Sequence, residues 1–111
     1  MEQSSLIQAM IVVNECPKRL LINNQWVDSL GGQTMTSINP SNEEEICKIQ
    51  IGTKEDVDAA VKAARNALRK GEWPEMGPSA RRNLMLKIAD KIEKNAAEIA
   101  YLECIENGKP Y

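Results

Sequence analysis

The chain has 111 residues and a mass of 12.4 kDa, which is room for one small domain. Its 14 basic and 16 acidic residues give a formal net charge of −2, so it lacks the basic surplus that nucleic-acid binding through phosphates requires. It contains no histidine, which excludes histidine general bases, histidine metal ligands and a Ser-His-Asp triad from its own residues.

The N-terminal stretch does not have the features of a targeting signal. No run approaches the roughly 18 apolar residues of a membrane helix, and the apolar residues 6–13 follow no basic residue. A mitochondrial presequence is rich in arginine, whereas this one holds Glu2 and Glu15 and no basic residue before Lys18. The three cysteines form no CxxC pair and leave one thiol unpaired in any disulfide scheme, which favours reduced, intracellular thiols. A cytoplasmic location is therefore expected.

The first half of the chain predicts strands after an N-terminal extension. Residues 1–17 show no sustained periodicity and are expected to form an extension that Pro17 ends. Asn23 and Asn24 tolerate positive φ and favour a tight hairpin turn. Alternation and turn signals predict four short strands, over residues 20–22, 25–27, 33–38 and 46–51. In the last of these, Cys47, Ile49 and Ile51 share one face, which is expected to be the apolar one.

The second half predicts three helices. Thr53 with Asp56 forms a capping box, and the apolar stripe that follows recurs at helical spacing to about residue 69. The members of this stripe are Val57, Ala60, Val61, Ala64 and Leu68. Gly71 ends this helix, and residues 73–78 predict a stiff connector.

Two further helices are expected after the connector. Ser79 is the predicted N-cap of the first, and Asn95 with Glu98 is a predicted capping box for the second, which ends at Asn107 and Gly108. The expected fold is therefore α/β, with β-hairpins followed by three helices. Since two-stranded ribbons are marginal alone, the strands are expected to belong to a larger domain.

No complete active site is predicted from the residues themselves. Lys109 follows Gly108, but the earlier glycine and the following hydroxyl residue of a phosphate loop are missing. Cys104 falls late in a helix between Glu103 and Glu106, where a thiolate is disfavoured, so an inert, packed thiol is expected. Cys47 is expected to lie in the core and Cys16 at the surface. The acidic run at residues 43–45 predicts a solvated turn, and both tryptophans are expected to be hydrophobic anchors.

Five segments follow one another in the order and spacing of a known family: residues 21–26 (LINNQW), 37–41 (SINPS), 54–65 (KEDVDAAVKAAR), 81–90 (RRNLMLKIAD) and 103–110 (ECIENGKP). Together they resemble the opening of the aldehyde dehydrogenase superfamily. The resemblance covers residues 18–111 and implies that they are part of one domain. That part would be the N-terminal portion of the family's Rossmann-like coenzyme-binding domain.

The resemblance implies an oxidation of an aldehyde to a carboxylic acid that depends on NAD or NADP. In the family a cysteine attacks the aldehyde, hydride passes to the nicotinamide, and a glutamate activates the water that hydrolyses the thioester. These residues and the coenzyme-binding motifs lie beyond the match to Tyr111, so none of Cys16, Cys47 and Cys104 inherits the role of nucleophile. The 111 residues alone are expected to be inactive, in a parent enzyme that is a homo-oligomer, either a dimer or a tetramer.

One family site falls on this chain. Some members bind a monovalent cation, K⁺ or Na⁺, through backbone oxygens before the Asn-Pro turn and an acid before the GKP element. By position these are Ser37, Ile38 and Glu106. The family usually has aspartate where this chain has Glu106, and the alternative is an ordinary residue of the helix's last turn.

Two other functional classes stay open at this stage. The helices after Thr53 could serve a non-catalytic binding or assembly module, through their apolar stripes. A relative of the family that acylates coenzyme A, or that has lost catalysis and kept a structural role, is the second alternative.

Overall fold

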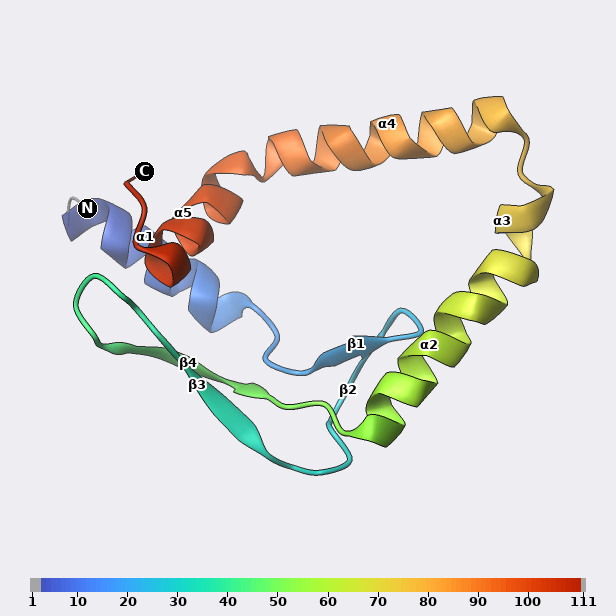
Figure 1. Ribbon diagram of the computed structural model, residues 1–111. Coiled ribbons are helices and arrows are strands. Elements are labelled where there is room, and N and C mark those ends of the chain that lie inside the picture. The colour runs from blue at the N-terminus through green and yellow to red at the C-terminus, as the bar shows by residue number, and fades with distance from the viewer. Residues whose placement is uncertain (1–2, 111) are drawn as a thin grey trace.

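The computed structural model describes residues 3–110 (Figure 1). In chain order the elements are α1 (Gln3–Glu15), β1 (Leu20–Ile22), β2 (Gln25–Val27), β3 (Thr34–Ile38), β4 (Glu45–Gln50), α2 (Lys54–Arg69), α3 (Glu72–Glu75), α4 (Pro78–Lys94) and α5 (Ala96–Asn107). The predicted order of hairpins followed by helices is confirmed.

The four strands form two separate antiparallel hairpins. β1 pairs only with β2, and β3 only with β4, within the described part of the chain. The first turn is formed by Asn23 at φ 52° and Asn24 at φ 60°, the left-handed pair that suits a two-residue hairpin. The second hairpin shifts register between Ser37 and Ile38, which indicates a β-bulge. The two predicted hairpins are therefore confirmed.

The N-terminal segment differs from its prediction, because helix α1 occupies most of it. Ala9 and Val13, four residues apart, are 0% and 4% exposed, and α1 lies beside α5 in Figure 1. Leu6, Ala9 and Val13 follow helical spacing. Apolar residues also occupy most other sides of this helix, however, so the sequence shows no single apolar face. The sequence pattern therefore did not predict this helix. The boundary proposed at residue 17 stays a prediction.

The apolar face of β4 was also predicted wrongly. Ile46 is the buried residue, whereas Ile49 and Ile51 on the other face are 37% and 39% exposed. Ile46 joins Ala9, Val13 and Ile105 in the core cluster. Since α1 was not expected, nothing in the strand's own alternation indicated which face a helix would cover.

Helix α2 begins as the sequence predicts. The Thr53 hydroxyl accepts a hydrogen bond from the Asp56 amide at 3.2 Å, and the Asp56 carboxylate accepts one from the Thr53 amide at 2.8 Å. This reciprocal capping box satisfies two amides that have no partner inside the helix. The helix ends before Gly71, which adopts φ 86°.

We expect Thr53→Ala to lower the free energy of unfolding by about 1 kcal/mol, because it removes the acceptor for the Asp56 amide. Urea unfolding followed by circular dichroism measures the loss. Ser79→Ala is the matched control, since no cap hydrogen bond is assigned to the start of α4, and it is expected to change stability by less than about 0.5 kcal/mol. Equal losses in the two variants would contradict the assignment of the cap.

The later helix boundaries bring three corrections. The N-cap of α4 is Gly77 with Pro78 in the first position, not Ser79. Asn95 precedes α5 without a side-chain cap bond there, since its side-chain amide donates to the Lys91 carbonyl at 2.7 Å and so completes the end of α4. The connector contains the short helix α3.

The start of α4 is tied to α3 through Arg81. The Arg81 guanidinium lies 5.0 Å from the centre of the Trp73 ring and donates to the Trp73 carbonyl at 2.9 Å. Trp73 is half-buried as a result, whereas Trp26 is 48% exposed and does not act as the expected anchor.

The fold is open rather than compact. Its radius of gyration is 17.4 Å, against about 13 Å for a compact chain of this length. Its accessible surface is 8693 Å², against roughly 6,100 Å² expected for a compact protein of this mass. Figure 1 shows α2, α3 and α4 as an arch that leads away from the hairpins and returns at α5. Among the described residues, no helix has the length and hydropathy needed to cross a bilayer.

Candidate functional site

The three residues of the expected cation site lie on two neighbouring elements. Ser37 and Ile38 end β3, at the bulge, and Ser37 lies opposite Cys47. Glu106 lies in the last turn of α5, is exposed, and lines a cavity of about 170 Å³ together with Cys47. The structure thus brings Glu106 to the strand that pairs with Ser37, while Ser37 and Ile38 themselves do not line this cavity.

The end of α5 is held against the Asn-Pro turn through Gly108. This residue adopts φ 73°, and a Cβ placed on it would lie 3.0 Å from Pro40 Cγ and 3.3 Å from Ser41 Oγ. A side chain here would therefore be both strained and crowded. The contact explains why a glycine suits the position and how the ends of β3 and α5 come together.

Lys18 lines the same cavity as Glu106, and its ammonium group donates to the Val13 carbonyl and, at 2.6 Å, to the Cys16 carbonyl. These are carbonyls at the end of α1, where the negative end of the helix dipole favours a cation. Within residues 3–110 no three His, Cys, Asp or Glu side chains gather as metal ligands, so a cation here would depend on backbone oxygens.

The Asp56 carboxylate accepts several hydrogen bonds, and the residue is 5% exposed. Besides the bond from Thr53, its carboxylate accepts bonds from the Ser29 hydroxyl at 3.1 Å and from the Leu30 amide at 3.3 Å. These bonds, that of the Thr53 amide first, hold the pKa of Asp56 below its usual range. The sequence predicted the capping box but not the contact of Asp56 with residues 29–30, because these residues lie far from Asp56 in the sequence.

Asp28 extends this network at the surface. Its carboxylate accepts a bond from the Gln50 side-chain amide at 2.9 Å and a two-pronged pair from Arg19 at 2.9 and 2.8 Å. The Gln50 bond and then Arg19 lower the pKa of Asp28. The bonds join the outgoing end of β2 to β4, so this acid, like Asp56, holds elements of the fold together.

We expect the free energy of unfolding to fall as the pH drops below about 4, the pKa of an unperturbed aspartate. Because the folded-state pKa of Asp56 is lowered, its stabilisation is complete above that pH and is lost as the pH falls towards the folded value. Urea midpoints between pH 7 and pH 3 measure the slope. Asp56→Asn is expected to flatten it, whereas Asp58→Asn, an exposed substitution in the same helix, should leave it steep. An unchanged slope in Asp56→Asn would refute this attribution.

The cysteines occupy structural positions. Cys104 is buried, as predicted for an inert thiol, while Cys16 and Cys47 are both half-buried, so the expectations of an exposed Cys16 and a core Cys47 were each partly wrong. All three are free thiols. The acidic turn at residues 43–45 is exposed, as predicted.

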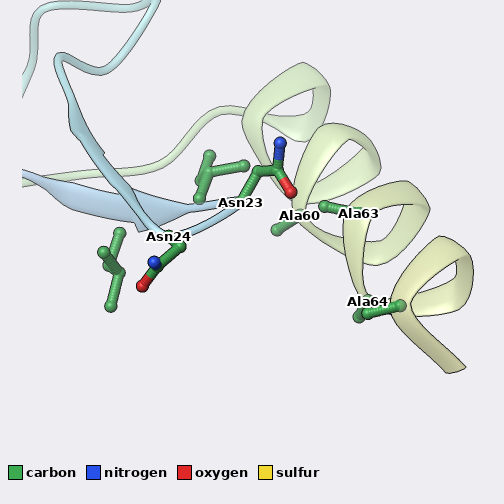
Figure 2. A pocket seen from close by; sticks show the side chains of 8 residues that line it. Asn23, Asn24, Ala60, Ala63 and Ala64 are labelled. Atoms are coloured by element: carbon green, nitrogen blue, oxygen red, sulfur yellow. The ribbon is translucent and has the colours of Figure 1, made fainter. Parts of the chain in front are cut away.

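A cavity lies between the first hairpin and α2, and Figure 2 shows it. It measures about 380 Å³ and is lined by residues 21–24 and by four alanines of α2: Ala60, Ala63, Ala64 and Ala67. Two of these alanines belong to the predicted apolar stripe, but only the structure shows that the hairpin forms the opposite wall. Its lining carries no charged side chain.

Comparison with known proteins assigns the family. The sequence model described as "Aldehyde dehydrogenase family" matches residues 26–111. The chain belongs to the aldehyde dehydrogenase family. The resemblance seen in the five sequence segments is thereby confirmed.

Individual aldehyde dehydrogenases agree with this assignment. The chain is 50% identical over 93 residues to "Aldehyde dehydrogenase 1" of Tanacetum cinerariifolium, a match to 84% of this chain and 19% of that protein. It is 43% identical over 109 residues to the human "Aldehyde dehydrogenase, mitochondrial", with 94% and 21% covered.

Solved structures confirm the fold. Betaine aldehyde dehydrogenase from Staphylococcus aureus in complex with NAD⁺ has a TM-score of 0.90 at 36% identity, covering 95% of this chain and 21% of that one. The NAD⁺ complex of an aldehyde dehydrogenase from Bacillus cereus has a TM-score of 0.84 at 42% identity, covering 91% and 20%. The chain therefore spans about a fifth of the length of these relatives.

Proposed function

We propose that this chain acts as a segment of an enzyme that oxidises an aldehyde to a carboxylic acid with NAD or NADP as hydride acceptor. The family match over residues 26–111 carries the proposal, and the fit to enzymes solved with NAD⁺ supports it. The segment would supply framework rather than reacting groups, since Asp28 and Asp56 are engaged in the hydrogen bonds that join β2, β4 and α2.

A chimera tests this function. The full chain replaces the segment that it matches in the Bacillus cereus aldehyde dehydrogenase, and NADH is followed at 340 nm with NAD⁺ and acetaldehyde. The chimera is expected to form NADH, while the isolated chain is expected to form none. A folded but inactive chimera would count against the proposal, and NADH from the isolated chain would refute its inactivity.

The alternative function is a non-catalytic binding or assembly module. The exposed apolar side chains along α2 and α4 would suit such a module equally well. The same assay separates the two, because such a module has no need to support hydride transfer in the chimera. An inactive, well-folded chimera would favour the module.

The proposal includes a cytoplasmic enzyme and a homo-oligomer, either a dimer or a tetramer. The odd number of cysteines supports a reducing compartment, although relatives such as the human one carry the name mitochondrial. Fractionation of cells that express the full chain and light scattering on the chimera measure the two properties directly.

We also propose that Ser37, Ile38 and Glu106 hold a monovalent cation in the enzyme. The bulge between Ser37 and Ile38 supports this, because a bulge interrupts the ladder and leaves a residue unpaired. Melting of the chimera in KCl, NaCl and choline chloride tests it. Glu106→Gln is expected to abolish any stabilisation by K⁺ or Na⁺ over choline, and a stabilisation that survives the substitution would exclude Glu106 as a ligand.

A further inference from the structure

Two of the three free thiols, those of Cys16 and Cys47, line the cavity of about 170 Å³ beside Glu106. Both cysteines are half-buried, so each keeps some surface that a small solute can reach. The third thiol, that of Cys104, is 4% exposed and is not among the described residues that line this cavity. Cys16 and Cys47 are therefore the pair of thiols that the fold brings together.

The chain segments that carry the two cysteines lie side by side. Helix α1 and strand β4 both run toward the first hairpin in Figure 1. They meet first where Val13 and Ile46 pack in the core cluster. They meet again where the Lys18 carbonyl accepts a hydrogen bond from the Gln50 amide at 3.0 Å. On each segment one cysteine lies between these two contacts, so the cysteines stand at corresponding positions.

This spacing matches the reach of a disulfide. Neighbouring extended segments joined by backbone hydrogen bonds lie about 4.8 Å apart. A disulfide joins Cα atoms that are roughly 4.4–6.8 Å apart. Ile46 and Cys47 are adjacent in β4 and yet both line the cavity, which fits the bulge at this point of the second hairpin, since a bulge redirects side chains.

We propose that Cys16 and Cys47 form an oxidisable dithiol site, which hydrogen peroxide converts to a disulfide. Peroxide first transfers one oxygen atom to one thiol, which becomes a sulfenic acid, and the rest of the peroxide leaves as water. The second thiol attacks this sulfur, so that the S–O bond breaks, an S–S bond forms and the oxygen leaves as a second water. The two sulfurs lose two electrons in all, and the peroxide gains them.

Peptide mapping of the full chain tests the site. The chain is treated with hydrogen peroxide, the remaining thiols are blocked with N-ethylmaleimide, and trypsin then cuts after lysine and arginine. The three cysteines fall on separate peptides, of residues 1–18, 20–48 and 95–111. Mass spectrometry of the unreduced digest therefore distinguishes every pairing.

We expect one link, between the first two peptides of the same chain, to be at least about tenfold more abundant than any link to Cys104. The number of free thiols should fall from three to one, and dithiothreitol should restore all three. Cys16→Ser and Cys47→Ser should each remove the link, whereas Cys104→Ala, the matched control, should retain it. In urea all three pairings should appear, because the unfolded chain does not select one.

The disulfide is also expected to raise the melting midpoint of the chain by at least about 5 °C, because the link between α1 and β4 restricts the unfolded state. Circular dichroism of the oxidised and reduced chains measures the difference. The Cys16→Ser variant, treated with peroxide in the same way, should show no rise.

Five outcomes would overturn the inference. They are a peroxide-treated chain that keeps three free thiols, a loss of thiols that dithiothreitol does not reverse, the same mixture of pairings with and without urea, a link between two chains in place of one within a chain, and an oxidised chain that melts no higher than the reduced one. None of these measurements depends on NADH formation, so the dithiol site and the proposed function are tested separately.

Discussion

Ile105→Ala is expected to lower the free energy of unfolding by about 2–5 kcal/mol, enough to unfold much of the isolated chain. Ile105 is 0% exposed and is the largest fully buried side chain among the described residues. It closes the core cluster that α1, β4 and α5 share, so its removal leaves a cavity where three elements meet. Urea unfolding followed by circular dichroism measures the effect.

Ile99→Ala provides the control, because this isoleucine lies on the same helix but is 45% exposed. We expect Ile99→Ala to lower the free energy of unfolding by less than about 1 kcal/mol. If both variants lost the same stability, the core would not lie where α1 meets α5, and the packing of the N-terminal helix would need to be revised.

Gly108→Ala is expected to lower stability by about 2–3 kcal/mol. A residue with a side chain is strained at φ 73°, and the added Cβ would lie 3.0 Å from Pro40 Cγ. The end of α5 already lies in close contact with the Asn-Pro turn at this point, so the backbone of one of them would have to move. Thermal and urea unfolding of the isolated chain measure the loss.

Gly71→Ala separates the two causes. Gly71 adopts φ 86°, but a Cβ there would meet nothing within 4 Å. Gly71→Ala is expected to lower the free energy of unfolding by about 1 kcal/mol, since only the backbone strain at positive φ contributes. This loss is clearly smaller than that of Gly108→Ala. Equal losses would show that the contact with Pro40 contributes nothing.

Local chemistry made much of the fold predictable. Asn23 and Asn24 encode their own turn, and Thr53 with Asp56 encodes the start of α2, because each effect acts within a few residues. The faces of β4 and the role of the N-terminal segment depend on α1 meeting α5, nearly a hundred residues apart in the sequence, and no local pattern reports such a contact.

In the candidate sites too, local features were predictable from the sequence, whereas contacts between distant segments were not. Ala60 and Ala64, which line the cavity of Figure 2, stood in the predicted apolar stripe, but the opposite wall of that cavity comes from the first hairpin. The three proposed cation ligands followed from family resemblance alone. The structure places two at a bulge and one in the last turn of α5.

The rate of NADH formation by the Bacillus cereus chimera tests the central claim most directly. We expect a rate within about tenfold of the unmodified enzyme, because the segment contributes framework and not the reacting groups. A soluble chimera with native-like circular dichroism and no NADH formation above a protein-free blank would contradict the account.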